Sequence, residues 1–177
     1  MWIKHLVGIV VSCVILTLGI VLNPFQVEAE SLNWGFKKGA QEKQAQAGGA
    51  FDELLKKYGA FYKGSPDEKI LYLTFDNGYE NGYTASILDT LKKEKVSGTF
   101  FLTGHYVESA TDIVNRMIKE GHEIGNHSYG HPNMANLSEA RMKDEWQKFD
   151  QLLAEKTDIK RTRFVRPPEG VFSEKLL

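Results

Sequence analysis

Cysteine is almost absent from this chain of 177 residues, which contains only Cys13. A single thiol cannot form an internal disulfide, and this one lies inside an apolar run near the N-terminus, so thiolate catalysis and Cys-ligated zinc are excluded for the rest of the chain. A charge bias is also absent, because 22 Lys and Arg residues face 23 Asp and Glu residues, for a formal net charge of -1. Nothing in the composition therefore favours nucleic acid or another polyanionic partner.

The apolar run around Cys13 predicts an export signal over residues 1–29. Lys4 precedes the run, the stretch from Leu6 to Leu22 is almost wholly apolar, and Ala29 is a small residue suited to a cleavage site. The run is at the short limit for a membrane span, so an uncleaved anchor is the alternative. Either interpretation places the remainder of the chain outside the cytoplasm.

The chain after the apolar run divides into a polar stretch and one domain. Residues 30–50 are largely polar and small, without a sustained apolar period, and predict a flexible linker. Apolar residues then recur at helical spacing from Phe51 to Tyr58, which predicts a short helix that ends at Gly59. The length of residues 51–177 suits a single domain.

Strand-like and helical patterns alternate from residue 70 onward. Short apolar runs predict strands at 70–75, 98–102, 123–125 and 164–165. Apolar spacing predicts helices at 84–91, at 113–118 before Gly121, and from the N-cap Ser138 with a buried stripe of Met142, Trp146, Phe149 and Leu153. The alternation specifies an α/β fold whose parallel strands are joined by helical crossovers, either an open layered sheet or part of a (β/α) barrel.

Polar residues suited to catalysis follow three of these strands. Asp76, the pair His127 and His131, and Arg166 each come directly after a strand, so they should share the sheet edge where parallel α/β folds place their active sites. Two histidines spaced four residues apart can ligate one cation, and a nearby aspartate can take a proton from water at that cation. Arg166 can fix the direction of the aspartate through a bidentate pair. Together these residues predict hydrolysis at a bound metal.

Each motif also has an interpretation without catalysis. Asn77 and Gly78 form a frequent hairpin turn, although the pattern after Tyr83 is helical rather than strand-like. The two histidines, taken alone, are equally consistent with surface or hydrogen-bonded residues. Arg166 precedes two prolines and would then be a surface residue before a stiff loop. The shared sheet edge favours the catalytic interpretation of all three.

Three motifs in this order resemble those of the polysaccharide deacetylases of the NodB-homology type. They are Thr74-Phe-Asp-Asn-Gly78, His127-Ser-Tyr-Gly-His131 and Arg166-Pro-Pro-Glu-Gly170. The resemblance extends from Asn33 to Leu177 and implies a distorted (β/α) barrel that removes acetyl groups from N-acetylated sugars. It also implies that residues 51–177 form a NodB-homology domain, as an incomplete barrel.

Longer runs are more narrowly similar to the delta-lactam-biosynthetic de-N-acetylases of endospore formers. These runs are Asn33–Phe36, Tyr72–Tyr83 and Thr103–Tyr106. The similarity implies hydrolysis of the N-acetyl group of N-acetylmuramic acid in peptidoglycan, the step that precedes muramic delta-lactam formation in spore cortex. Peptidoglycan glycan strands are then the expected partner of an exported, monomeric enzyme of the cell wall or spore cortex, and no protein partner is implied.

The resemblance also implies roles for individual residues. Asp76 is the expected general base, and Arg166 is the residue that orients it. The expected cofactor is a divalent metal ion, Zn²⁺, and its expected ligands are His127, His131 and Asn77, the last at a position where most of the wider family has Asp. The expected substrate contacts are His105, Tyr79 and Pro168.

The family continues beyond Leu177, so the resemblance predicts a C-terminally truncated domain. A late Leu-x-His motif, whose His acts as general acid toward the leaving amine, is expected outside this chain. Three alternatives to an active de-N-acetylase therefore stay open. They are an impaired glycan-binding fragment, a misfolded fragment, and a carbohydrate O-acetyl esterase of the same geometry, since an ester needs no strong general acid.

Overall fold

The computed structural model describes residues 31–40 and 43–177, and its centre is a three-stranded parallel sheet. The strands are β2 (Thr74–Asn77), β3 (Thr99–Leu102) and β4 (Glu123–Asn126), in the order β2-β3-β4. Each crossover between neighbouring strands contains helix, as a parallel sheet requires. The expected α/β class, an incomplete barrel with helical crossovers, is confirmed.

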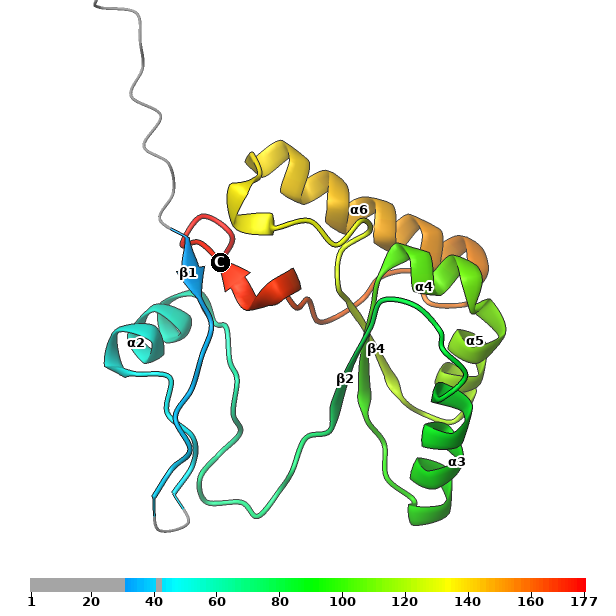
Figure 1. Ribbon diagram of the computed structural model, residues 1–177, viewed down its shortest axis with the longest axis horizontal. Helices are drawn as coiled ribbons and strands as arrows, with labels where there is room; N and C mark the ends of the chain where they lie inside the picture. Colours follow the sequence, from blue (N-terminus) through cyan, green and yellow to red (C-terminus); the bar gives the residue numbers. More distant parts are fainter. Residues whose placement is uncertain (1–30, 41–42) are drawn as a thin grey trace, which may run out of the picture.

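Helices cover one side of this sheet. They are α3 (Thr84–Glu94), α4 (Gly104–Ser109), α5 (Thr111–Lys119) and α6 (Glu139–Lys156). In Figure 1, α3, α4 and α5 stand together on one side of the strands, while α2 (Gly49–Tyr58) lies on the opposite side. The buried core forms between the sheet and the helices, and includes Leu88, Phe100, Leu102, Val114, Ile124 and Phe149. This packing fixes the strands, and with them the strand ends that carry the candidate site residues.

Helix boundaries follow the signals in the sequence. Ser138 precedes α6 in an extended conformation, and its Oγ accepts the backbone N–H of Arg141 at 3.4 Å. Gly59 ends α2 with φ of 70°, a left-handed conformation that glycine adopts without steric cost. Both boundaries were expected, and both are confirmed.

Two of the four predicted strands differ from the observed ones. The first strand begins at Thr74, and the segment before it is solvent-exposed, with Leu71 90% exposed. The predicted fourth strand is reduced to a single parallel bridge between Val165 and Asn126, because Pro167 and Pro168 follow and cannot donate to a strand ladder. The short helix α4 was not expected. Its N-cap is Thr103, whose Oγ1 accepts the N–H of Tyr106 at 3.3 Å.

Residues 31–36 differ from the flexible linker expected over 30–50. Strand β1 (Leu32–Asn33) pairs antiparallel with β5 (Val171–Phe172), and the N–H of Trp34 donates to the carbonyl of Gly170 at 2.7 Å. The Trp34 ring packs on Tyr62 with a centroid separation of 4.8 Å. An aromatic residue that buries apolar area accounts for this order, which the polar composition of the stretch concealed. The division into linker and domain stays a prediction.

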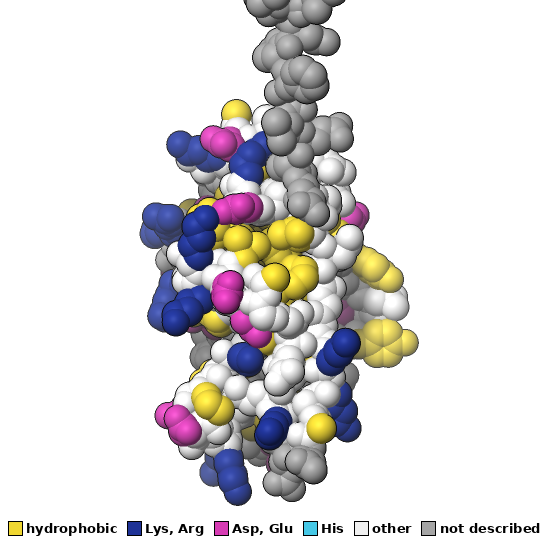
Figure 2. Space-filling model, turned by 90° about the vertical axis from the view of Figure 1, so that its left-hand side faces the viewer, with side chains coloured by type: hydrophobic (Ala, Val, Ile, Leu, Met, Phe, Trp, Pro, Cys, Tyr) yellow, Lys and Arg dark blue, Asp and Glu magenta, His cyan; other side chains and the backbone are white. Residues whose placement is uncertain are grey.

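The predicted export signal, residues 1–29, lies outside the described residues. Within 31–40 and 43–177, no helix combines the length and hydropathy needed to cross a membrane. Figure 2 shows the face on the α2 side of the molecule, where acidic and basic side chains are interspersed around a group of hydrophobic ones. That mixture agrees with the balanced charge of the sequence and offers no broad basic surface on this face.

Candidate active site

Three separate segments meet at the carboxyl edge of the sheet. Asp76 and Asn77 end β2, and His127 follows β4, where its N–H donates to the carbonyl of Leu102 in β3 at 2.9 Å. The N–H of Arg166 donates to the carbonyl of Asn126 at 2.9 Å, which places the third motif beside β4. Parallel pairing therefore brings the aspartate, the histidine pair and the arginine to one edge, as the sequence predicted.

Arg166 reaches back across the sheet to Asp76. Its Nη1 donates to Asp76 Oδ1 at 2.5 Å, and its Nη2 donates to Thr74 Oγ1 at 3.1 Å. Because Nη2 binds Thr74, only one nitrogen binds the carboxylate, and the bidentate pair expected from the sequence is not formed. The two bonds nevertheless hold the guanidinium along β2 and fix one oxygen of Asp76, leaving the other oxygen for a different partner.

An aromatic ring supports the long side chain of Arg166. Asp76, Phe101 and Gly125 are register partners across β2, β3 and β4, so their Cα atoms form one row. The Arg166 guanidinium lies 4.1 Å from the centroid of the Phe101 ring, a cation–π contact. A Cβ on Gly125 would lie only 2.4 Å from Phe101 Cδ1. The glycine therefore makes room for the ring that carries the arginine.

The two histidines face each other after β4. Their ring centroids are 4.9 Å apart with the planes at 72°. The Nδ1 of His127 lies 2.9 Å from the backbone carbonyl oxygen of Arg166, and since a carbonyl can only accept, this nitrogen carries the proton. The Nε2 of His127 is then the nitrogen with a free lone pair, which is the arrangement found in metal-ligating histidines.

Burial favours the uncharged form of His127. Its side chain is buried, and this burial lowers the pKa of the imidazole below its ordinary value. The hydrogen bond to the Arg166 carbonyl and the charge of Asp76 act in the opposite direction, while His131 and Arg166 lower the pKa further. The net effect favours the neutral ring, the form that binds a cation.

The turn between the histidines has an unusual backbone. Ser128 and His131 adopt positive φ values of 69° and 56°, which are uncommon for residues other than glycine. The Asn126 side chain accepts the N–H of Ser128 at 2.8 Å, and the Ser128 hydroxyl accepts the N–H of His131 at 2.9 Å. These bonds stabilise a strained turn, and such strain is common where side chains must point at one target.

Asn77 has a buried oxygen without a partner. Its Oδ1 is shielded from solvent, and none of the described residues donates a hydrogen bond to it. The backbone carbonyl of the same residue accepts the N–H of Thr103 at 3.1 Å, so the strand end itself is fixed. A buried acceptor left unsatisfied costs about 1–3 kcal/mol, unless a ligand or water binds it. This oxygen at the end of β2 can therefore accept a bond from a ligand or a water molecule.

A partly exposed carboxylate that the sequence analysis did not single out holds the loop after β2. Glu80 Oε2 accepts the hydroxyl of Tyr106 at 2.6 Å, and its Oε1 accepts the N–H of Gly82 at 2.6 Å. The Tyr106 hydroxyl also lies 3.0 Å from Thr84 Oγ1. Tyr106 is fully buried, and burial followed by the bond to Glu80 raises the pKa of its phenol well above the ordinary range. This network fixes the path of residues 78–84.

The three expected substrate contacts have different surroundings. Tyr79 is 67% exposed on the loop after β2. His105 is exposed on the first turn of α4. Pro168 is buried at the start of a 3₁₀ turn, Pro168–Gly170, so it shapes the segment after Arg166 rather than presenting a free surface. Tyr79 and His105 thus remain available to a ligand, whereas Pro168 acts on the backbone.

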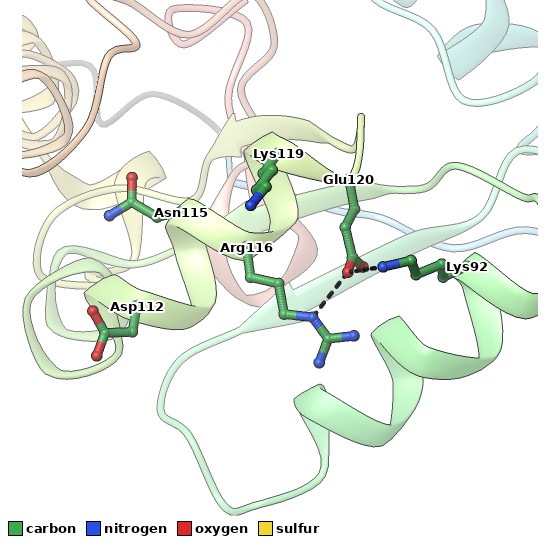
Figure 3. Close-up of a pocket in the computed structure, with 6 residues that line it drawn as sticks. All are labelled: Lys92, Asp112, Asn115, Arg116, Lys119 and Glu120. Carbon is green, nitrogen blue, oxygen red and sulfur yellow. Dashed lines mark hydrogen bonds and ion pairs between the residues drawn. The ribbon is translucent and has the colours of Figure 1, made fainter.

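One hollow of the described surface lies away from this site. It is a groove of about 540 Å³ on the side of α3 and α5 that Figure 3 shows, lined by Lys92, Asp112, Asn115, Arg116, Lys119 and Glu120. Arg116 binds Glu120 at 3.1 Å and Asp89 at 2.5 Å, and Lys92 binds Glu120 at 3.4 Å. Its basic groups are largely paired, as in a surface ion-pair network. The candidate site is the open carboxyl edge of the sheet.

The motifs and the fold belong to a known family. The polysaccharide deacetylase family matches residues 63–177, and this chain belongs to that family. The peptidoglycan-N-acetylmuramic acid deacetylase PdaA of Bacillus subtilis (strain 168) is 46% identical over 151 residues, which cover 85% of this chain and 57% of PdaA. The chain thus spans a little over half the length of that relative.

Solved structures of relatives share the fold. The structure of Bacillus subtilis PdaA, described as a family 4 carbohydrate esterase, matches with a TM-score of 0.79 at 46% identity, over 83% of this chain and 63% of that chain. A family 4 carbohydrate esterase from Bacillus anthracis matches with a TM-score of 0.74 at 44% identity, over 82% of this chain and 66% of that one. The predicted NodB-type resemblance is confirmed.

Proposed function

We propose that this protein hydrolyses the N-acetyl group of N-acetylmuramic acid in peptidoglycan. The observation that carries the proposal is the meeting of Asp76, held by Arg166, with the facing rings of His127 and His131 at one sheet edge. Membership of the polysaccharide deacetylase family and 46% identity to a peptidoglycan-N-acetylmuramic acid deacetylase support the reaction and the substrate class.

Asp76 is proposed as the general base. Arg166 holds one carboxylate oxygen at 2.5 Å, so the other is left to take a proton from the attacking water. The second guanidinium bond, to Thr74, keeps Arg166 from following the carboxylate as it moves. Arg166 is therefore a positioning residue, and it reduces the motions that would take Asp76 out of line with the water.

Deacetylases of this family are metalloenzymes, which supports a divalent cation as the cofactor of this protein. We propose His127, His131 and Asn77 as its ligands and Zn²⁺ as its identity. The free Nε2 of a neutral His127 and the unsatisfied buried oxygen of Asn77 support this assignment. Such a cation, when bound, polarises the acetamide carbonyl and lowers the pKa of water. The amide of Asn77 adds no negative charge, so the site should bind a cation less tightly than one with a second aspartate.

The substrate is proposed to be a glycan strand outside the cytoplasm. The names of relatives that act on peptidoglycan support that location, at the cell wall or the spore cortex, and the delta-lactam pathway is the proposed context. Tyr79 and His105, which are both exposed near the sheet edge, are the proposed sugar contacts, and Pro168 shapes the loop behind Arg166. A monomer is proposed as the working state.

The test is acetate release from peptide-free glycan strands. Asp76→Asn keeps the size of the side chain and removes the base, so release should fall by about 10²- to 10⁴-fold. Asp112→Asn, an equal change at an exposed residue of α5, is the matched control and should keep the parent rate. Equal rates for Asp76→Asn and the parent would refute the assignment of the base.

The same assay separates the alternative functions. A chain that binds glycan strands but releases no acetate is a glycan-binding protein. A chain that releases acetate only from O-acetylated sugars is an esterase. This is the second candidate, because the solved relatives are described as family 4 carbohydrate esterases. Cooperative thermal unfolding, followed by circular dichroism, distinguishes either outcome from a misfolded fragment.

A further inference from the structure

A buried carboxylate on α6 binds the turn that separates the two histidines. Glu145 is 7% exposed, and its Oε2 accepts the backbone N–H of Gly130 at 2.7 Å. Gly130 lies between His127 and His131, directly before the residue with φ of 56°. A charged acceptor at this distance makes one of the stronger hydrogen bonds available to a backbone amide. It therefore acts on the part of the turn that sets the position of His131.

Helix α6 also holds the beginning of the same turn. Asn126 is fully buried, and its Nδ2 donates to the backbone carbonyl of Trp146 at 3.1 Å. Its Oδ1 accepts from Ser128, as described above. The helix thus binds the turn at two points, through neighbouring residues Glu145 and Trp146. A rigid element that supports a site from behind is the usual means of keeping ligand side chains in place.

Glu145 occupies a position where an apolar residue would be expected. The buried side chains of α6 are Met142, Glu145, Phe149 and Leu153, which lie on one stripe of the helix. A carboxylate in that row loses solvation that a neutral amide partner restores only in part. An apolar residue of similar volume would pack there at lower cost. The bond to Gly130 therefore explains why a side chain with an acceptor oxygen occupies this place in the row.

We infer that Glu145 is a positioning residue that fixes the spacing of His127 and His131 for cation binding. The inference rests on the proposed function, in which the two histidines are ligands. It predicts that the acceptor oxygen, rather than the charge, is what the site needs, because the partner is a neutral N–H. Two substitutions separate these properties: Glu145→Gln keeps an acceptor oxygen, and Glu145→Met has none, while both remove the charge at nearly constant volume.

The experiment measures Zn²⁺ binding to the purified chain by isothermal titration calorimetry. Glu145→Met should weaken Zn²⁺ binding about tenfold or more, the usual effect of losing a residue that orients metal ligands, while Glu145→Gln stays within about threefold of the parent. Glu155→Met, at an exposed position of α6, is the matched control and should leave binding unchanged. Equal affinities for the Gln and Met variants would overturn the inference.

A second measurement does not depend on the metal. The amide of Gly130 should exchange with solvent at least tenfold faster in Glu145→Met than in the parent, as followed by NMR, because its acceptor has been removed. If the parent binds no Zn²⁺, the proposed function fails while this exchange rate still tests the role of Glu145. If Glu145→Met does not unfold cooperatively, Glu145→Gln decides, since a tenfold loss of affinity or faster Gly130 exchange in that variant overturns the inference.

Discussion

Adding a single methyl group at Gly125 should reduce both stability and activity, because it displaces the ring that supports Arg166. In Gly125→Ala the new Cβ would lie 2.4 Å from Cδ1 and 2.5 Å from Cε1 of the Phe101 ring. Carbon atoms in contact are normally about 3.5–4.0 Å apart, so the ring must move by roughly 1 Å. Overpacking of this kind costs about 1–3 kcal/mol of folding free energy. Urea unfolding should show a loss of that size.

The displaced ring also carries Arg166, whose guanidinium lies 4.1 Å from the ring centroid. Moving it by about 1 Å displaces the group that holds Asp76, and a misplacement of that size costs about 10²-fold in rate. Acetate release should therefore fall by about ten- to hundredfold in Gly125→Ala. Gly49→Ala is the control, because its Cβ would meet no heavy atom within 4 Å.

The double variant Gly125→Ala/Phe101→Leu separates the effect of overpacking at Gly125 from the effect of losing the aromatic ring under Arg166. Leucine relieves the overlap, so stability should recover relative to Gly125→Ala. Leucine offers no aromatic face to Arg166, and the cation–π contact is worth about 0.5–2 kcal/mol, so activity should stay low. Parent activity in Gly125→Ala, or full activity in the double variant, would refute the role of Phe101 as the support of Arg166.

Three further outcomes are expected. Arg166→Lys keeps the charge but cannot bind Asp76 and Thr74 at once, so acetate release should fall at least tenfold. The melting temperature, followed by circular dichroism, should change little. Acetate release at the parent rate would contradict the role of Arg166. Tyr106→Phe removes a donor to Glu80 and should cost about 1–3 kcal/mol in urea unfolding at pH 7. Burial raises the pKa of Glu80, but its hydrogen bonds outweigh burial and lower the pKa below the ordinary value of 4.5. The stabilisation from ionised Glu80 is therefore present above about pH 4.5 and is lost as the pH falls through the lowered pKa. The difference in stability between parent and Tyr106→Phe should therefore shrink on acidification, and a constant difference would refute the role of the ionised form. Dialysis against EDTA should abolish acetate release and lower the melting temperature, both restored by Zn²⁺, whereas full activity after chelation would refute the metal proposal.

The alternation of strands and helices could be predicted because it depends on local patterns. A short apolar run and helical spacing located β3 and α6, and the glycine after α2 marked its end. The common edge of the three motifs followed from parallel connectivity alone, and the structure brings them together there. These features need no knowledge of which distant residues touch.

The features that could not be predicted depend on contacts between distant residues. The stripe of α6 was expected to bury Trp146, whereas the structure buries Glu145 and leaves Trp146 partly exposed. Hydropathy favours tryptophan for that place, and only the Gly130 amide, which belongs to another segment, explains the carboxylate. A charged residue three positions after Met142 and four before Phe149 was the available signal, since it interrupts an apolar period.

The pairing of β1 with β5 has a consequence for how the protein matures. Leu32 finds its partner only in Phe172, so nearly the whole described chain must be made before the first strand can add to a sheet. Long-range pairing of this kind is slow, because a large loop must close, at a cost in entropy, before any stabilising hydrogen bond can form. On the ribosome the segment around Trp34 would wait unpaired while the central sheet assembles. A chaperone that binds unfolded chains would therefore meet strand β1 before its partner strand β5 has been made.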